Sequence, residues 1–108
     1  MKVLIAASTT TERRHLIATL DRCWAIWGAF EVATGPGGKL EEWVSTWAER
    51  RGAAWTPLRL CLWPEERPDA AIIFDAAHSP RTRILARQVK RLWGVPVHEY
   101  GAKEKSDG

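Results

Sequence analysis

Short apolar runs alternate along the chain with longer segments of helical periodicity. The runs at residues 3–7, 30–34 and 70–75 predict strands buried on both faces, and the sequence VPVHEY at residues 95–100 predicts a last strand. A further strand fits within residues 54–62, where Pro57 limits how much of the segment lies inside a sheet, because proline has no N–H to donate.

Between these runs, apolar residues recur at the spacing of amphipathic helices. The first helix is expected to follow a capping box formed by Thr9 and Glu12 and to end at Gly28, and the second is expected to end at Gly52. Their apolar faces consist of Leu16, Ile17, Leu20, Cys23, Trp24 and Trp27 in the first helix, and of Leu40, Trp43, Val44, Trp47 and Ala48 in the second.

A third helix has the clearest end signals, with Ser79 as its N-cap, Pro80 at its first position and Gly94 at its end. The resulting order of strands and helices predicts an α/β fold, a Rossmann-like three-layer sandwich around a mostly parallel five-stranded sheet. Residues 1–100 are expected to form one domain and residues 101–108 a flexible polar tail.

Composition agrees with one globular domain of 108 residues, of which 45% are hydrophobic and 27% are charged. No apolar run approaches the roughly 18 residues of a membrane span, and the polar sequence TTTERRH follows the first apolar run, where a signal peptide would still be apolar. We therefore expect a cytoplasmic protein with no membrane contact. Cys23 and Cys61 match no metal or redox spacing, so we expect buried thiols and neither a metal nor a cofactor.

In a parallel sheet, ligands bind where the carboxyl ends of the strands lead into helix N-termini. This edge is expected to gather residues 8–11, 35–39 and 76–82. The glycines around Lys39 do not form a Walker A loop, which would need glycine at Ala33 and serine or threonine at Leu40. The dinucleotide fingerprint also fails at Leu40, so a plain turn and a phosphate site both stay open for this segment.

Three places in the chain resemble the SLOG superfamily, in particular its YspA-like and YpsA-related branch, which is related to the LOG phosphoribohydrolases. Residues 7–9 align with a Gly-Ser-Arg turn, and residues 35–52 align without a gap with Gly-Gly-Ala-x-Gly-Ala-Asp and a following helix. Residues 74–82 align with Phe-x-x-Gly-x-Ser-x-Gly-Thr. The sequence departs from the family where Ala7, Pro36, Lys39, Ala77 and Arg81 replace glycine.

The resemblance implies a pocket for a nucleotide or a nucleotide-derived signalling ligand, held by backbone amides together with side chains of the three loops. The candidate ligand-binding residues are Ser8, Thr9, Gly35, Gly37, Gly38, Lys39, Glu41, Ser79, Arg81, Thr82 and Arg83. Catalysis of the LOG type is disfavoured, since the helix that would carry its acid has no carboxylate between residues 80 and 93.

Two alternatives use other features of the chain. Basic residues at helical spacing (Arg83, Arg87, Lys90 and Arg91) predict a basic stripe that can contact nucleic acid, although the formal net charge is only +3. Seven tryptophans exceed what a small sheet can easily bury, which favours a homo-oligomer. Trp63 is a candidate for stacking on a base. A structural or oligomeric protein with a degenerate pocket therefore stays open as an alternative.

Overall fold

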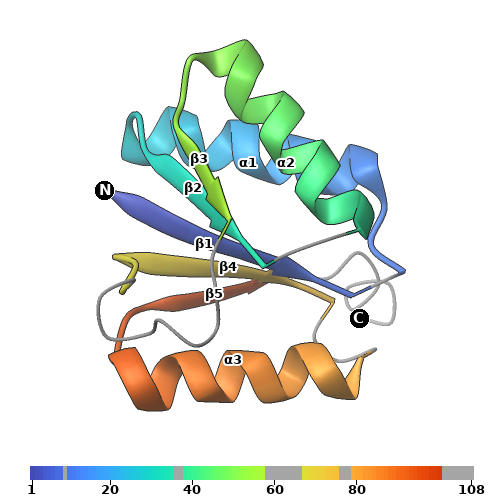
Figure 1. The fold of residues 1–108 in the computed structure, drawn as a ribbon, viewed down its shortest axis with the longest axis vertical. Helices are drawn as coiled ribbons and strands as arrows, with labels where there is room; N and C mark the ends of the chain where they lie inside the picture. Colours follow the sequence, from blue (N-terminus) through green and yellow to red (C-terminus); the bar gives the residue numbers. More distant parts are fainter. Residues whose placement is uncertain (9, 36–37, 58–66, 76–78, 101–108) are drawn as a thin grey trace.

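The computed structural model describes residues 1–8, 10–35, 38–57, 67–75 and 79–100, and for Arg81 it describes the backbone alone. Strands and helices alternate along the described residues in the order expected from the sequence (Figure 1). They are β1 (Lys2–Ala7), α1 (Arg13–Trp27), β2 (Glu31–Thr34), α2 (Gly38–Arg51), β3 (Trp55–Pro57), β4 (Ala70–Phe74), α3 (Pro80–Trp93) and β5 (Val97–Tyr100).

The five strands form one parallel sheet in the order β3-β2-β1-β4-β5. The central strand is β1, in which Ile5 pairs with Thr34 of β2 on one side and with Ile72 of β4 on the other. The predicted Rossmann-like α/β sandwich is confirmed, and the sheet is parallel throughout. The short strand β3 is at one edge and ends at Pro57, so the missing N–H of proline costs the sheet little.

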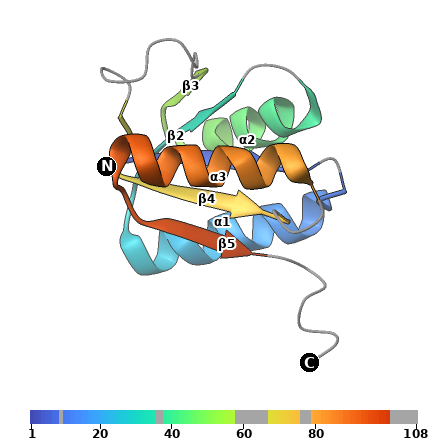
Figure 2. The same cartoon turned by 90° about the horizontal axis from the view of Figure 1, so that it is seen from below.

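Helices cover both faces of the sheet: α1 and α2 lie together on one face, and α3 lies on the other (Figures 1 and 2). Alternate strand residues therefore enter two separate hydrophobic clusters. Val3, Ile5 and Phe74 face α1 and α2, whereas Leu4, Ala6 and Ala71 face α3. Both clusters are almost fully buried, which explains the continuous apolar runs of the central strands.

The end signals of α3 are confirmed in detail. Ser79 is its N-cap and accepts a hydrogen bond from the backbone N–H of Thr82, Pro80 is its first residue, and Gly94 ends it in the left-handed conformation. The capping box expected at the start of the first helix is wrong. Helix α1 begins at Arg13, after an N-cap residue, Glu12, that makes no side-chain capping bond.

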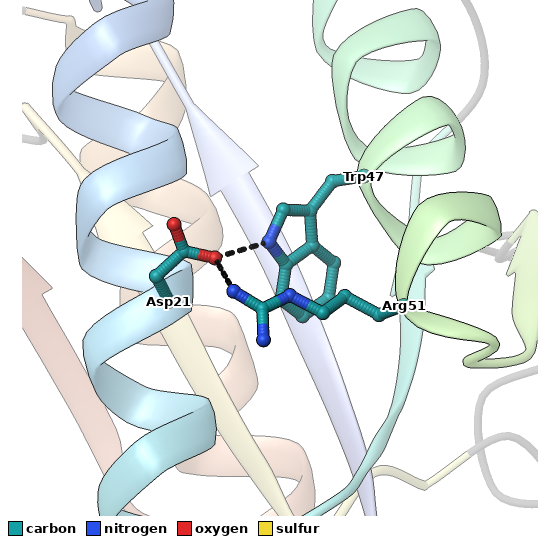
Figure 3. A network of polar contacts seen from close by, with 3 residues as sticks. All are labelled: Asp21, Trp47 and Arg51. Carbon is teal, nitrogen blue, oxygen red and sulfur yellow. Dashed lines mark hydrogen bonds and ion pairs between the residues drawn. The ribbon is translucent and has the colours of Figure 1, made fainter.

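A polar network joins the two helices that share one face of the sheet (Figure 3). The Trp47 Nε1 group donates a hydrogen bond of 2.9 Å to Asp21 Oδ1, and the Arg51 guanidinium pairs with the same oxygen. The guanidinium carbon of Arg51 also lies 5.8 Å from the ring centroids of Trp24 and Trp47. These contacts fix α1 against α2 by a combination of hydrogen bonding, ion pairing and cation–π attraction.

Tryptophan mostly has the structural role that the helical spacing predicts. Trp47 and Trp93 are buried, and Trp24, Trp27 and Trp43 are partly buried against the cluster beneath α1 and α2. Trp63 lies outside the described residues, as do Cys61 and the proposed tail at residues 101–108. No helix in the described part of the chain has the length and apolarity needed to cross a membrane.

Candidate functional site

The carboxyl edge of the sheet has a topological switch point between β1 and β4. From β1 the chain adds β2 and β3 on one side, and it then returns to add β4 and β5 on the other side. Connections at such a point leave the sheet in opposite directions, which opens the strand ends to a ligand. The residues that follow β1 and β4 are therefore the first candidates for contacts with a ligand.

A network of hydroxyl groups and one carboxylate connects these two strand ends. The Thr11 hydroxyl donates a hydrogen bond of 2.6 Å to Asp75 Oδ2, and the Ser8 and Thr11 hydroxyl oxygens are 3.5 Å apart. Ser8 Oγ also lies 2.8 Å from Thr10 Oγ1 and accepts from the Thr10 backbone N–H. The Ser8 N–H donates to the Phe74 carbonyl, so backbone and side chains both tie β1 to β4.

Asp75 is the member of this network that the sequence analysis did not include among its candidates. Its side chain is buried, with 5% of the residue exposed, and its backbone has a φ of +54°. Aspartate tolerates this left-handed conformation better than most residues do. Its N–H donates to the Tyr100 carbonyl at 2.6 Å. The sequence signal was an acidic residue directly after the clearest strand of the chain.

The N-terminus of α3 lies beyond β4 and carries two of the predicted site residues. The Thr82 hydroxyl and backbone N–H both donate to Ser79 Oγ, at 3.1 and 3.2 Å. Because the Thr82 hydroxyl donates its proton to Ser79 Oγ, the Ser79 O–H is the hydroxyl of this pair that is left to donate to another group. Arg83 is exposed in the same turn and takes part in an interaction within the chain. The Arg81 side chain lies outside the described residues.

On the other side of β1, the chain leaves β2 toward the N-terminus of α2. Gly35 is half-buried, and a Cβ atom built there meets no heavy atom within 4 Å. Gly38 starts α2 with a φ of +80°, a conformation that favours glycine. Lys39 is exposed, and Glu41 is half-buried and has a partner in the chain. Thr9 and Gly37, which were also predicted to bind the ligand, lie outside the described residues.

Two titratable groups, Cys23 of α1 and Tyr100 of β5, contact each other outside the hydroxyl network. Cys23 Sγ lies 3.9 Å from the Tyr100 hydroxyl oxygen, and burial raises the pKa of both groups. The thiol therefore stays protonated at neutral pH, as expected for a small buried side chain and unlike a reactive thiolate. Among the described residues, no three His, Cys, Asp or Glu side chains are arranged to hold a metal ion.

His15 adds a polar atom near the end of β4. Its ring packs edge-on against Phe74, with the ring centroids 5.6 Å apart. Its Nε2 atom is buried and has no hydrogen-bond partner, the one such side-chain nitrogen or oxygen among the described residues. A buried nitrogen of this kind is normally satisfied by a ligand group or an ordered water. The sequence offered no signal for it beyond the presence of a histidine in the first turn of α1.

The fold and this edge together define a Rossmann-like α/β domain with a polar switch point. Comparison with known proteins found no matching family model and no significantly similar curated protein or solved structure. The resemblance to the SLOG superfamily therefore stays a prediction from its three sequence segments.

Proposed function

We propose that the carboxyl edge of the sheet binds a nucleotide or a nucleotide-derived signalling ligand, for sensing or sequestration. The observation that supports this proposal best is the cluster of Ser8, Thr11 and Asp75 on the two strand ends that flank the switch point. Polar groups at this place in a parallel sheet are the usual means of orienting a ligand. Ser79, the N-cap of the helix that follows β4, adds a further hydroxyl group to this side of the sheet.

The chemistry of the edge suggests how such a ligand lies. Asp75 carries a buried carboxylate, which repels phosphate, so we assign the uncharged hydroxyl-bearing part of the ligand to the side of Ser8 and Asp75. We assign the phosphate to the segment from Gly35 to Lys39, where the exposed Lys39 lies in the first turn of α2. Binding without hydrolysis is favoured because α3 contains no carboxylate that can act as an acid.

A glycine substitution tests this assignment without disturbing the fold. Because a Cβ at Gly35 meets open space and its φ is not left-handed, Gly35→Val should fold normally and should block only a ligand that approaches the backbone. Ala29→Val is the matched control, since Ala29 is exposed just before β2 at the opposite edge of the sheet. Isothermal titration would use adenine nucleotides, cyclic dinucleotides and ADP-ribose.

The expected result is binding of at least one of these compounds by the wild-type protein and by Ala29→Val, with at least a tenfold loss in Gly35→Val. No binding across the panel would contradict the proposed function. Equal binding by Gly35→Val and Ala29→Val would contradict the assignment of the phosphate to this turn.

We also propose that the protein forms a homo-oligomer in the cytoplasm. The support for self-association is the surface of α1, where Trp24 and Trp27 are only partly buried and Ile26 is 70% exposed. Partly exposed indole rings beside an exposed aliphatic residue are typical of protein interfaces.

A further inference from the structure

The outer face of α3 has a composition unlike the rest of the chain. This helix carries five of the sixteen Lys and Arg residues and none of the thirteen Asp and Glu residues, so the remainder of the chain has a formal net charge of −2. Figure 2 shows α3 lying in front of the sheet, and it is the one described helix on that face. The electrostatic potential is therefore positive on the side of the molecule that α3 covers.

The exposed residues of α3 form two adjacent ridges, each with a spacing of four residues. The cationic ridge consists of Arg83, Arg87 and Arg91. The second ridge, called the apolar ridge after its two aliphatic residues, consists of Ile84 and Leu92 with the polar Gln88 between them. All six residues are exposed. The opposite face of the helix, with Ala86, Val89 and Trp93, is buried against the sheet. The two ridges are therefore not needed to hold α3 in place.

The apolar ridge is unusual for a solvated helix face. Ile84 is 53% exposed and Leu92 is 55% exposed, which makes them two of the four large hydrophobic residues that the described surface presents. They lie about 12 Å apart along the helix axis, on one side of the cationic ridge. Arg87 and Arg91 form no ion pair with any other described residue, and Lys90 is 3.9 Å from Glu99 on the far flank.

Ridges of this kind define how another helix can pack. When two helices pack through their four-residue ridges, a ridge of one fits into the groove between two ridges of the other, at a crossing angle near −50°. The groove on α3 has cations along one wall, and along the other it has Ile84 and Leu92 with Gln88 between them. A helix that fills it needs acidic residues next to aliphatic ones. Nucleic-acid interfaces are more polar and more uniformly charged than this groove, and nucleic acid would leave the apolar ridge without a partner.

From these two ridges we propose that the outer face of α3 is a docking surface for an acidic amphipathic helix of a partner protein. The positive charge of α3 accelerates the encounter, and the apolar ridge supplies the part of the contact that excludes water. Arg83 belongs both to the cationic ridge and to the candidate ligand-binding residues, so the docking surface is tested at Ile84, Arg87, Arg91 and Leu92, which lie outside the proposed site.

A peptide assay tests the chemistry of the groove. Three probes are compared by fluorescence anisotropy at about 50 mM salt: an 18-residue helical peptide with glutamate and leucine ridges side by side, a scrambled peptide of the same composition, and a 20-base-pair DNA duplex. We expect the ridged peptide to bind most tightly. Arg87→Gln and Arg91→Gln should each weaken its binding about threefold. The effect of each substitution should be smaller at high salt, which screens charge.

The apolar ridge distinguishes a protein partner from a nucleic acid. Ile84→Ser and Leu92→Ser should each weaken binding of the ridged peptide about fivefold and leave binding of the duplex unchanged. Arg50→Gln, an exposed substitution at the end of α2, is the control and should change nothing. Equal binding of the scrambled peptide, tighter binding of the duplex, or indifference to the serine variants would each overturn the proposal.

A photoreactive residue in place of Gln88, between the two exposed aliphatic residues, then identifies the natural partner in cells that produce the protein. The expected adduct is resistant to nuclease, maps to a segment with acidic and aliphatic residues four apart, and is lost with Ile84→Ser or Arg87→Gln. A nuclease-sensitive adduct, an adduct to lipid, or the same adducts from a photoreactive residue at Glu49 on the opposite side of the sheet would overturn the proposal. The absence of any adduct would also count against it.

Discussion

Replacing Thr11 by valine removes one hydroxyl group from the network that joins β1 to β4. Valine has nearly the same shape as threonine, so packing is kept, but Asp75 Oδ2 loses a hydrogen bond of 2.6 Å and faces a methyl group instead. Thr11 is 6% exposed and Asp75 is 5% exposed, so water cannot easily replace the donor. A buried hydrogen bond to a charged group contributes about 1.5–3 kcal/mol, and we expect Thr11→Val to lower the free energy of unfolding by about 2 kcal/mol.

The measurement is urea denaturation followed by tryptophan fluorescence, supported by a thermal scan. For a domain of this size, a loss of about 2 kcal/mol lowers Tm by roughly 10 °C. Thr11→Ser is the control, because it keeps the hydroxyl and removes one methyl group, at a cost of about 0.8 kcal/mol. A double-mutant cycle with Asp75→Asn isolates the pair from the other interactions of Asp75, and we expect a coupling energy of about 1 kcal/mol or more. A Thr11→Val variant within about 0.5 kcal/mol of wild type, or one no worse than Thr11→Ser, would refute the assignment.

Three further predictions concern the rest of the molecule. In the network of Figure 3, Arg51→Gln should lower the free energy of unfolding by less than about 1 kcal/mol, because the Asp21–Arg51 pair is partly exposed. Trp47→Ala, which empties a buried site, should lower it by about 3–5 kcal/mol. Urea denaturation of the two variants tests this order. Burial raises the pKa of Cys23 above 9.0 and the pKa of Tyr100 above 10.0, so the unfolded chain binds fewer protons than the native chain above about pH 9. The free energy of unfolding should therefore fall as the pH rises through this range. The fall should be less steep in Cys23→Ala. Stability that does not change between about pH 8 and 11 would contradict this. Sedimentation equilibrium should give a mass above the 12.2 kDa of one chain, and a monomer at high concentration would exclude the proposed homo-oligomer.

The sequence predicts α3 almost to the residue because its signals are local. Ser79 accepts from a backbone N–H three residues away, Pro80 already has the φ of the first helical residue, and Gly94 supplies the left-handed end. The start of α1 was predicted wrongly for the opposite reason. The Thr11 hydroxyl donates a hydrogen bond to Asp75, 64 residues along the chain, and the Thr11 N–H donates to the Ser8 carbonyl before the helix begins. A contact of that separation has no local pattern.

The candidate site shows the same division between local and distant information. Gly35, Lys39 and Ser79 could be proposed from turn and capping signals, together with the rule that ligands bind at strand carboxyl ends. Asp75 and His15 could not, because their surroundings come from distant parts of the chain. Asp75 meets Thr11 and Tyr100, and the His15 ring packs against Phe74. The assignment of alternate β1 residues to opposite faces, with Ile5 facing α1 and α2 and Ala6 facing α3, likewise needed the structure.

The two proposed surfaces use α3 in different ways, and neither uses the residues that hold it to the sheet. The ligand-binding edge involves the first turn of the helix, where Ser79 is the N-cap. The docking surface lies along the outer face, and Ala86 and Val89 bury the inner face. Because exposed substitutions away from caps and buried networks usually change stability by less than about 0.5 kcal/mol, loss of partner binding in a ridge variant can be attributed to the ridge itself. Loss of ligand binding in Gly35→Val can be attributed to the edge on the same grounds, since a Cβ at this position meets no heavy atom within 4 Å.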